Sequence, residues 1–259
     1  MNIKFYKYHG TGNDFIMIDN FKGQYDLSEL DKDRISLLCH RRFGIGADGL
    51  IILEASENSD FNMVYFNADG AESTMCGNGG RCILAMAHAL EYIGDDAIFN
   101  AIDGLHKGRV GDQIEIQLKD VDHIDNSEDD YILDTGSPHY VRFISDVHQL
   151  NIIPIAHEIR YNDVYKEEGI NVNFVESLQG DFYLRTYERG VENETMSCGT
   201  GVTATAIAIH EKYDHLESPI ELRTPGGILQ VSFDKTEEGY KNVWLKGPAT
   251  LVFEGYLDI

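Results

Sequence analysis

The chain has 259 residues, and 44 acidic side chains against 21 basic ones give a formal net charge of -23 at pH 7. A hydrophobic content of 42% is enough for a packed core, which excludes a disordered chain. The acid excess argues against nucleic-acid or anionic-membrane partners, because binding to either depends on clustered Lys and Arg. The length predicts one large domain or two smaller ones.

The amino-terminal residues 1–9 alternate polar and apolar side chains, and no apolar segment followed by a cleavage site is present there. No apolar run approaches the roughly 20 residues that cross a bilayer. The four cysteines are too few for a disulfide scaffold, and none forms a C-x-x-C pair. We therefore expect a cytoplasmic protein with free thiols and no bound metal.

Short segments of alternating polarity, typical of strands, dominate the chain. In chain order, the expected strands are residues 2–8, 15–19, 50–54, 61–66, 97–102, 114–118, 140–145, 181–187, 219–223, 228–233, 242–246 and 251–257. Helical spacing is confined to residues 28–41 with Ser28 as the N-cap, 78–93, 152–160 and 200–213. Because strands and helices do not alternate regularly, we expect an α+β fold rather than a doubly wound parallel sheet.

Two halves of the sequence repeat one another. Thr11-Gly12 corresponds to Thr135-Gly136, and Cys76-Gly77-Asn78-Gly79 corresponds to Cys198-Gly199-Thr200-Gly201, in the same order and at nearly the same spacing. Such a repeat predicts two domains of related structure.

A heavily acidic run at residues 120–130 lies between the two halves and predicts the domain boundary. The expected domains are residues 1–120, which carry Cys76 and are joined by residues 250–259, and residues 121–249, which carry Cys198. Both domains are expected to be rich in β-structure.

The two C-G-x-G elements suggest the chemistry, because each follows a strand and opens a helix. A cysteine at the start of a helix lies among unpaired backbone N–H groups, which stabilise a thiolate and lower the thiol pKa. The same N–H groups can bind a carboxylate, and glycines allow a ligand to approach closely. If the two helix starts face each other, a thiolate removes an α-hydrogen from one face of a substrate while a thiol returns a proton to the other. No lysine motif for a Schiff base is present, so we expect a reaction without a cofactor.

Other readings of these glycines and cysteines are less consistent with the sequence. No Gly-Lys-Ser/Thr follows the G-N-G-G stretch, and Cys82 replaces the third glycine of a dinucleotide-binding fingerprint. Cys39 and Cys82 lie on expected helices without a partner in the repeat, so we interpret both as buried structural residues.

Several longer motifs are spread over the chain: His9-Gly10-Thr11-Gly12-Asn13-Asp14-Phe15, Gly44-Ile45-Gly46-Ala47-Asp48-Gly49, Phe66-Asn67-Ala68-Asp69-Gly70, Met75-Cys76-Gly77-Asn78-Gly79-Gly80-Arg81-Cys82, Asn171-Val172-Asn173-Phe174, Tyr187-Glu188-Arg189-Gly190 and Ser197-Cys198-Gly199-Thr200-Gly201. As a set, they resemble the diaminopimelate epimerase family over essentially the whole chain. The resemblance implies a cofactor-free enzyme that converts LL-diaminopimelate to the meso form in bacterial lysine and peptidoglycan-precursor synthesis. It also implies two pseudosymmetric domains, each a sheet or barrel wrapped around a central helix, a cleft that closes over substrate, and a homodimer.

The resemblance assigns roles to individual residues. It makes Cys76 and Cys198 the acid/base pair and adds His139 and Glu188 to the catalytic residues, although a histidine after Pro138 is by itself more typical of a structural loop. The residues around the reacting carboxylate are Gly77, Asn78, Gly199 and Thr200. The residues that hold the amino and carboxylate groups are Asn13, Asn67, Asn171, Glu188 and Arg189, since Arg binds a carboxylate bidentately and Glu pairs with an ammonium group.

The chain departs from the family pattern at three places. Ser137 stands where many members have asparagine, and Gly49 stands where some have a glutamine that reaches the ligand. Glu192-Asn193 occupies a loop that is often one residue shorter. These departures concern binding detail rather than the cysteines.

Three other functions fit parts of the pattern. A proline racemase or hydroxyproline epimerase also uses two cysteines, but its substrate has no distal amino-acid end for Glu188, Arg189, Asn67 and Asn171 to bind. A cysteine hydrolase would use one thiol with His139 as its base. A non-catalytic amino-acid-binding protein would bind the ligand without exchanging its α-hydrogen.

Overall fold

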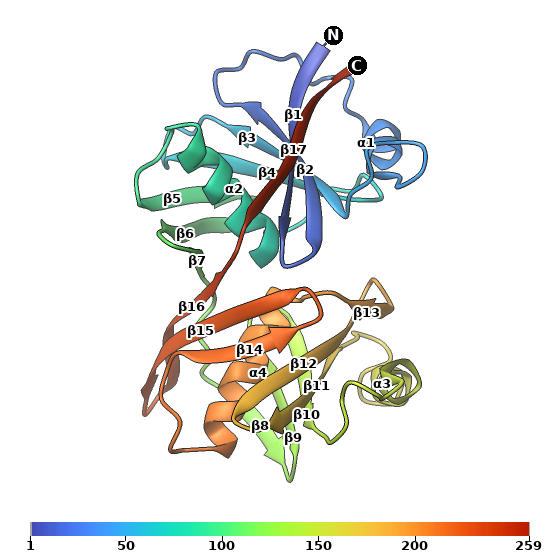
Figure 1. The fold of residues 1–259 in the computed structure, drawn as a ribbon, viewed down its shortest axis with the longest axis vertical. Helices are drawn as coiled ribbons and strands as arrows, with labels where there is room; N and C mark the ends of the chain where they lie inside the picture. Colours follow the sequence, from blue (N-terminus) through green and yellow to red (C-terminus); the bar gives the residue numbers. More distant parts are fainter. Residues whose placement is uncertain (1, 259) are drawn as a thin grey trace. The chain divides into compact units, whose positions relative to one another are not determined.

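The computed structural model describes residues 2–258 and divides them into two units, coloured along the chain in Figure 1. Unit 1 consists of residues 2–116 and 247–258, and unit 2 is Gln117–Lys246. The chain therefore leaves unit 1 after Ile116 and returns to it for its last strand.

Unit 1 places its first and last strands side by side (Figure 1). In chain order it contains β1 (Asn2–Gly10), β2 (Asn13–Asn20), α1 (Lys32–Cys39), β3 (Gly49–Glu54), β4 (Phe61–Asn67), α2 (Gly77–Ala89), β5 (Asp96–Ala101), β6 (Gly104–Val110), β7 (Ile114–Gln117) and β17 (Thr250–Asp258). The pairs β2–β3 and β4–β5 are parallel, whereas β1–β2, β3–β4, β5–β6, β6–β7 and β1–β17 are antiparallel. A two-residue turn at Thr11 and Gly12, both with positive φ, connects β1 to β2.

Unit 2 repeats this topology. In chain order it contains β8 (Ile124–Ser127), β9 (Asp130–Asp134), β10 (Pro138–Phe143), α3 (Ile152–Arg160), β11 (Asn171–Leu178), β12 (Asp181–Glu188), β13 (Asn193–Thr195), α4 (Gly199–Lys212), β14 (Ile220–Thr224), β15 (Gly227–Thr236) and β16 (Gly239–Gly247). The pairs β10–β11 and β12–β14 are parallel, as are β2–β3 and β4–β5 in unit 1. Strand β8 pairs with β9 on the side where β17 pairs with β1 in unit 1. The two-repeat α+β fold expected from the sequence is therefore confirmed.

One helix in each unit is enclosed by strands. Helix α2 packs against β1, β2, β3 and β6, and α4 packs against β9, β10, β11, β12, β14 and β15. A helix that contacts strands so far apart in the sheet requires the sheet to curve around it. Every residue from Gly201 to Ile209 is buried, as expected for a helix that has no solvent-facing side.

The shorter helices cover the opposite face of each sheet. Ile16 and Ile18 of β2 pack with Ile35 of α1, whereas Phe15 points toward the start of α2. In unit 2, Val172 and Phe174 of β11 lie in the core cluster beneath α3. The alternation along β11 therefore turns the intervening asparagines toward α4.

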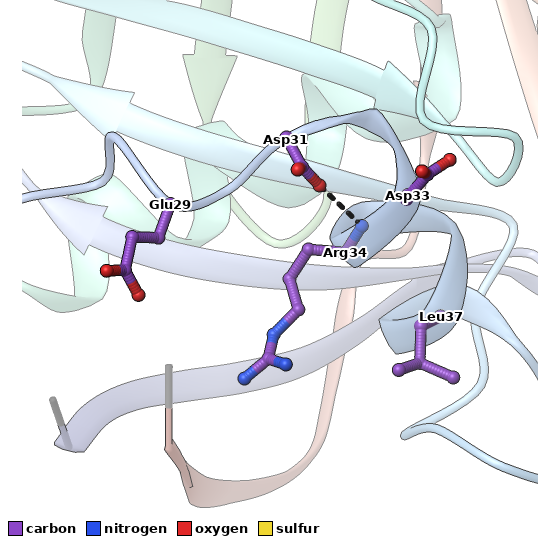
Figure 2. A pocket seen from close by; sticks show the side chains of 5 residues that line it. All are labelled: Glu29, Asp31, Asp33, Arg34 and Leu37. Carbon is purple, nitrogen blue, oxygen red and sulfur yellow. Dashed lines mark hydrogen bonds between the residues drawn. The ribbon is translucent and has the colours of Figure 1, made fainter.

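Helix α1 is shorter than predicted, and its N-cap differs from the prediction. The Asp31 Oδ1 accepts a hydrogen bond from the Arg34 backbone N–H at 2.8 Å, and this bond is drawn in Figure 2. The prediction of Ser28 as the N-cap was wrong: its backbone N–H donates to Asp26 in a turn before the helix. Asp31 is the better cap because its carboxylate reaches the third residue after it, where an unpaired N–H group lies.

The acidic run at residues 120–130 forms structure instead of a free linker. Its second half contributes to the β8–β9 hairpin. Asp130 accepts two hydrogen bonds from the Arg142 guanidinium, at 2.7 Å each, and Asp129 pairs with Lys212. Alternation of polarity could not reveal these strands, because Asp129 and Asp130 are paired with basic side chains that only the fold brings near them.

Candidate active site

Both predicted acid/base cysteines occupy the N-cap position of an enclosed helix. Cys76 precedes α2 with φ -94° and ψ 128°, and Cys198 precedes α4 with φ -114° and ψ 112°. Neither side chain forms a capping hydrogen bond to its own helix, and neither helix has an acidic residue in its first turn. Each sulfur therefore lies at the positive end of a helix, as the sequence predicts.

Close packing explains the glycines that follow the cysteines. A Cβ atom on Gly80 would lie 2.4 Å from the Ile116 Cδ1, and one on Gly201 would lie 2.5 Å from the Asn173 Oδ1. A side chain at position 80 would require Ile116 to move, and one at position 201 would collide with an amide that is held by hydrogen bonds. The glycines thus have a packing role in addition to the ligand approach expected from the sequence.

In unit 1, Asn13 connects the Cys76 thiol to a fixed hydrogen-bond network. The Asn13 Oδ1 accepts from the Cys76 Sγ at 3.5 Å and from the Asn78 Nδ2 at 3.2 Å. The Asn13 Nδ2 donates to the Asp48 Oδ2 at 2.8 Å, and the Arg81 Nη2 donates to the Asn78 Oδ1 at 2.8 Å. Because a carboxylate only accepts and a guanidinium only donates, both amides have a defined orientation.

Arg81 is a buried cation behind this network. Its side chain is fully buried, and it also donates to the Gly77 carbonyl and the Thr11 hydroxyl. Burial lowers the pKa of Arg81 to about 10, whereas the neighbouring Cys82 and Cys76 act in the opposite direction. The guanidinium remains charged at neutral pH and adds positive potential near the start of α2.

In unit 2, a chain of polar side chains leads from His139 to the Cys198 sulfur. The His139 Nε2 lies 3.0 Å from the Ser137 Oγ, which lies 3.4 Å from the Thr200 Oγ1. The Thr200 Oγ1 lies 3.5 Å from the Cys198 Sγ. On its other side, the His139 Nδ1 lies 3.0 Å from the Asn173 Nδ2. The structure therefore brings together three residues that the sequence assigns to the site.

His139 is completely buried, and burial lowers its pKa to about 3. The imidazole is therefore neutral at physiological pH, and a base of this strength removes a proton from a thiol poorly. This environment disfavours the hydrolase alternative, in which His139 is the general base. It fits a residue that acts through its hydrogen bonds.

Asn171 and Arg189 form a second group in unit 2. The Asn171 Oδ1 accepts from the Arg189 backbone N–H at 2.9 Å, and its Nδ2 donates to the Ser137 Oγ at 3.1 Å. The Arg189 Nη1 donates to the Glu168 carbonyl at 2.9 Å. Glu188 is the last residue of β12. This strand end thus presents a carboxylate and a half-buried guanidinium in adjacent positions.

Asn67 lies apart from the Cys76 network. It is exposed at the end of β4, where its backbone N–H donates to the Ala71 carbonyl. Within residues 2–258, its side chain has no hydrogen-bond partner. Its role in binding stays a prediction from the resemblance.

The sequence did not indicate that Asp48, Arg81 and Asn173 orient other residues of the site. It also did not indicate that Ser137 links His139 to Thr200. Three of them lie inside the motifs from which the resemblance was drawn, and Ser137 is one of the departures. The available signal was a polar residue within a motif, because such a side chain must find a partner where the fold buries it.

The remaining cysteines are buried thiols with unfavourable environments for a thiolate. Burial raises the pKa of Cys39 to about 11 and that of Cys82 to about 12. Their interpretation as structural residues agrees with this burial.

A cavity of about 380 Å³ lies beside α1 (Figure 2), and neither Cys76 nor Cys198 lines it. It is lined by Glu29, Asp31, Asp33, Arg34 and Leu37. None of the predicted site residues lines it.

Among the described residues, no group of three or more His, Cys, Asp and Glu side chains could hold a metal ion. In residues 2–258, every helix is too short or too polar to cross a membrane.

Solved structures define the class of fold. A phenazine biosynthesis protein of the PhzF family from Bacillus anthracis has a TM-score of 0.76 at 14% identity, with 100% of both chains covered. A hydroxyproline epimerase from Agrobacterium vitis has a TM-score of 0.64 at 13% identity, covering 99% of this chain and 92% of that one. The chain therefore has the two-repeat fold that these proteins share.

The sequence comparisons identify the family. A diaminopimelate epimerase from Flavobacterium psychrophilum is 49% identical over 259 residues, which cover 97% of this chain and 99% of that protein. The sequence profile of the family described as diaminopimelate epimerase matches residues 5–124 and 131–252. The chain belongs to the diaminopimelate epimerase family.

Proposed function

We propose that this protein is an isomerase that interconverts LL-diaminopimelate and meso-diaminopimelate without a cofactor, in lysine and peptidoglycan-precursor synthesis. One observation carries the proposal: two units of the same topology each hold a cysteine at the N-cap of an enclosed helix, in a chain of this family. The family membership supplies the substrate, and the paired cysteines supply the reaction type.

The proposed reaction needs one thiolate and one thiol on opposite faces of the α-carbon. The thiolate takes the α-hydrogen as a proton, which leaves a carbanion stabilised by the adjacent carboxylate. The other thiol then donates its proton to the opposite face, so the two cysteines exchange protonation states in each turnover. Efficient transfer requires both sulfur atoms to come within roughly 3 to 3.5 Å of the carbon.

The helix starts support the carboxylate as charge develops on it. The first N–H groups of α2 and α4 have no partner within their helices, and Gly77, Asn78, Gly199 and Thr200 carry them. Donors aimed at a developing anion in a site closed to water lower the barrier more than they would in solvent. The buried charge of Arg81 acts in the same direction.

The remaining site residues bind the amino and carboxylate groups of the substrate. In this proposal, Arg189 holds a carboxylate bidentately and Glu188 holds an ammonium group. Asn13, Asn67 and Asn171 complete the polar contacts, and His139 positions its neighbours through hydrogen bonds. A substrate with two amino-acid ends uses all of these groups, whereas proline uses only part of them.

Alanine variants of the two cysteines test the proposal. We expect Cys76→Ala and Cys198→Ala each to lower the rate of LL-diaminopimelate epimerisation by at least ~100-fold, because each removes one proton-transfer group. Cys39→Ala is the matched control, since that thiol is buried and has no role in the proposed reaction. This variant should keep most of the activity of the wild type. Substantial turnover by either site variant, or faster racemisation of proline than epimerisation of diaminopimelate by the wild type, contradicts the proposal.

The proposal extends to a cytoplasmic homodimer that binds neither nucleic acid nor membranes. The free thiols fit a reducing compartment, and the net charge of -23 disfavours anionic partners. Light scattering on the purified protein measures the assembly: a mass of twice the chain supports the dimer, and a mass of one chain contradicts it.

A further inference from the structure

The orientation of Asn173 determines which nitrogen of His139 carries the proton. The Asn173 Oδ1 accepts from the Thr186 hydroxyl at 2.9 Å, and its Nδ2 donates to the Tyr140 carbonyl at 3.1 Å. Since a carbonyl can only accept, the Nδ2 is the atom that also meets the His139 Nδ1. The Nδ1 is therefore an acceptor, and the hydrogen of the neutral ring is on Nε2.

The His139 Nε2–H forms a hydrogen bond to the hydroxyl of Ser137. The Ser137 Oγ accepts from the His139 Nε2–H at 3.0 Å and from the Asn171 Nδ2 at 3.1 Å. With both lone pairs occupied, its own hydrogen is directed to the Thr200 Oγ1 at 3.4 Å. The Thr200 hydroxyl thereby accepts a bond, and the Cys198 Sγ lies 3.5 Å from its oxygen, within reach of its own hydrogen.

We propose that Ser137 is a positioning residue that orients the Thr200 hydroxyl as a hydrogen-bond donor to the Cys198 sulfur. The inference rests on the proposed function for its catalytic meaning. The direction of the hydrogen bonds as far as the Thr200 hydroxyl follows from the amides of Asn173 and Asn171 and the imidazole of His139. A donor directed at sulfur favours the thiolate over the thiol. Cys76 differs, because its contact at Asn13 is an acceptor and favours the thiol.

The charged groups near the hydrogen bonds from His139 to Cys198 do not reverse the direction of these bonds. The ionisable side chains at the surrounding strand ends are Asp134 on β9, His139 on β10, Glu188 on β12 and the adjacent Arg189, and Lys119 pairs with Asp134 at 3.4 Å. Asp134 and Arg189 act on His139 in opposite senses, and burial dominates both. The imidazole therefore stays neutral across the range in which a thiol titrates.

The test is the pH dependence of Cys198 alkylation by iodoacetamide, followed peptide by peptide by mass spectrometry on the full-length reduced protein. We expect Ser137→Ala to raise the pH midpoint for Cys198 by roughly one unit, the size of one hydrogen bond to a charged group. Ser137→Thr keeps a hydroxyl at this position and should restore the wild-type midpoint. Cys76 in the same samples is the internal control, and its midpoint should not move.

Activity measurements distinguish the positioning role from a structural one. The pH profile of kcat/KM for LL-diaminopimelate should shift with the Cys198 midpoint in Ser137→Ala and return in Ser137→Thr. If Ser137→Ala does not fold, Thr200→Val removes the hydroxyl next to the Cys198 sulfur and should shift the Cys198 midpoint in the same direction. An unchanged Cys198 midpoint, or equal shifts at Cys76 and Cys198, overturns the inference. A wild-type protein without epimerase activity overturns the proposed function instead, while the alkylation midpoints still decide the orientation of the chain.

Discussion

The polar side chains of the two cysteine networks differ in the group that meets the sulfur. Cys76 lies against an amide oxygen, and Cys198 lies against a hydroxyl. The position of each cysteine at the start of a helix could be predicted from the sequence because both stand in C-G-x-G elements. The residues that orient each network could not be predicted. Asp48 contacts Asn13, and Asn173 contacts His139, only because the fold brings together segments that are distant in the sequence.

Buried His139 gives the protein a pH-dependent stability. Its pKa is lowered to about 3 by burial, whereas an unfolded histidine titrates near 6.5. Between these values the unfolded state binds one more proton, so falling pH favours unfolding, and this penalty is absent above about pH 6.5. We expect the free energy of unfolding of the wild type to fall by about 1.4 kcal/mol per pH unit from this group alone between roughly pH 6 and 4.

Urea unfolding at several pH values, compared with His139→Asn, isolates the contribution. The variant should show a shallower decline over this interval. The exposed His123, with 78% of its side chain accessible, is the control position, and His123→Asn should behave as the wild type does. Equal slopes for the wild type and His139→Asn would refute a neutral buried imidazole.

At the scale of elements, the contact between β11 and the start of α4 holds the site of unit 2 in place. The added Cβ of Gly201→Ala would lie 2.5 Å from the Asn173 Oδ1 and 3.4 Å from the His139 Cε1. Because Asn173 orients His139, we expect the substitution to lower kcat/KM by ~10-fold or more and to destabilise the fold by about 1 to 3 kcal/mol. Gly94→Ala, where a Cβ meets nothing within 4 Å, should leave both quantities unchanged. An active, stable Gly201→Ala variant would show that the contact is not needed.

The N-cap of α1 offers a second test at this scale. Asp31→Ala removes the carboxylate that caps the helix and should lower the free energy of unfolding by about 1 kcal/mol. Ser28→Ala removes a side chain that does not cap the helix and should change it by less than ~0.5 kcal/mol. Chemical denaturation of both variants checks the assignment, and a larger loss at Ser28 would reverse it.

The enclosed helices and the hydrophobic strands were predictable because their side-chain periodicity survives in the sequence. Strand β11 was not predicted, because the alternation of polar and apolar residues in Asn171-Val172-Asn173-Phe174 is only four residues long and ends at Val175. Its asparagines belong to the hydrogen-bond network around Ser137 and His139 in the candidate site. The β8–β9 hairpin was missed for a different reason, because its acidic residues resemble a solvated loop.

At the scale of the whole molecule, duplication explains why one reaction would need the entire chain. Each unit supplies one cysteine N-cap and one set of helix N–H donors, and neither supplies both proton carriers. The acid excess remains a property of the surface: the proposed substrate carries two ammonium and two carboxylate groups, so its net charge is zero. Local groups, rather than the net charge of -23, therefore govern the thiols.

The transfer of solvent deuterium during conversion of LL-diaminopimelate in heavy water tests the two-thiol mechanism most directly. The protein is kept reduced, and substrate and product are analysed by mass spectrometry and NMR at low conversion. Because one thiolate removes the α-hydrogen and a different thiol delivers the new one, the meso product should carry one deuterium at the inverted centre while the remaining LL substrate carries almost none. Deuterium appearing equally in substrate and product from the start, or in neither, would contradict the mechanism.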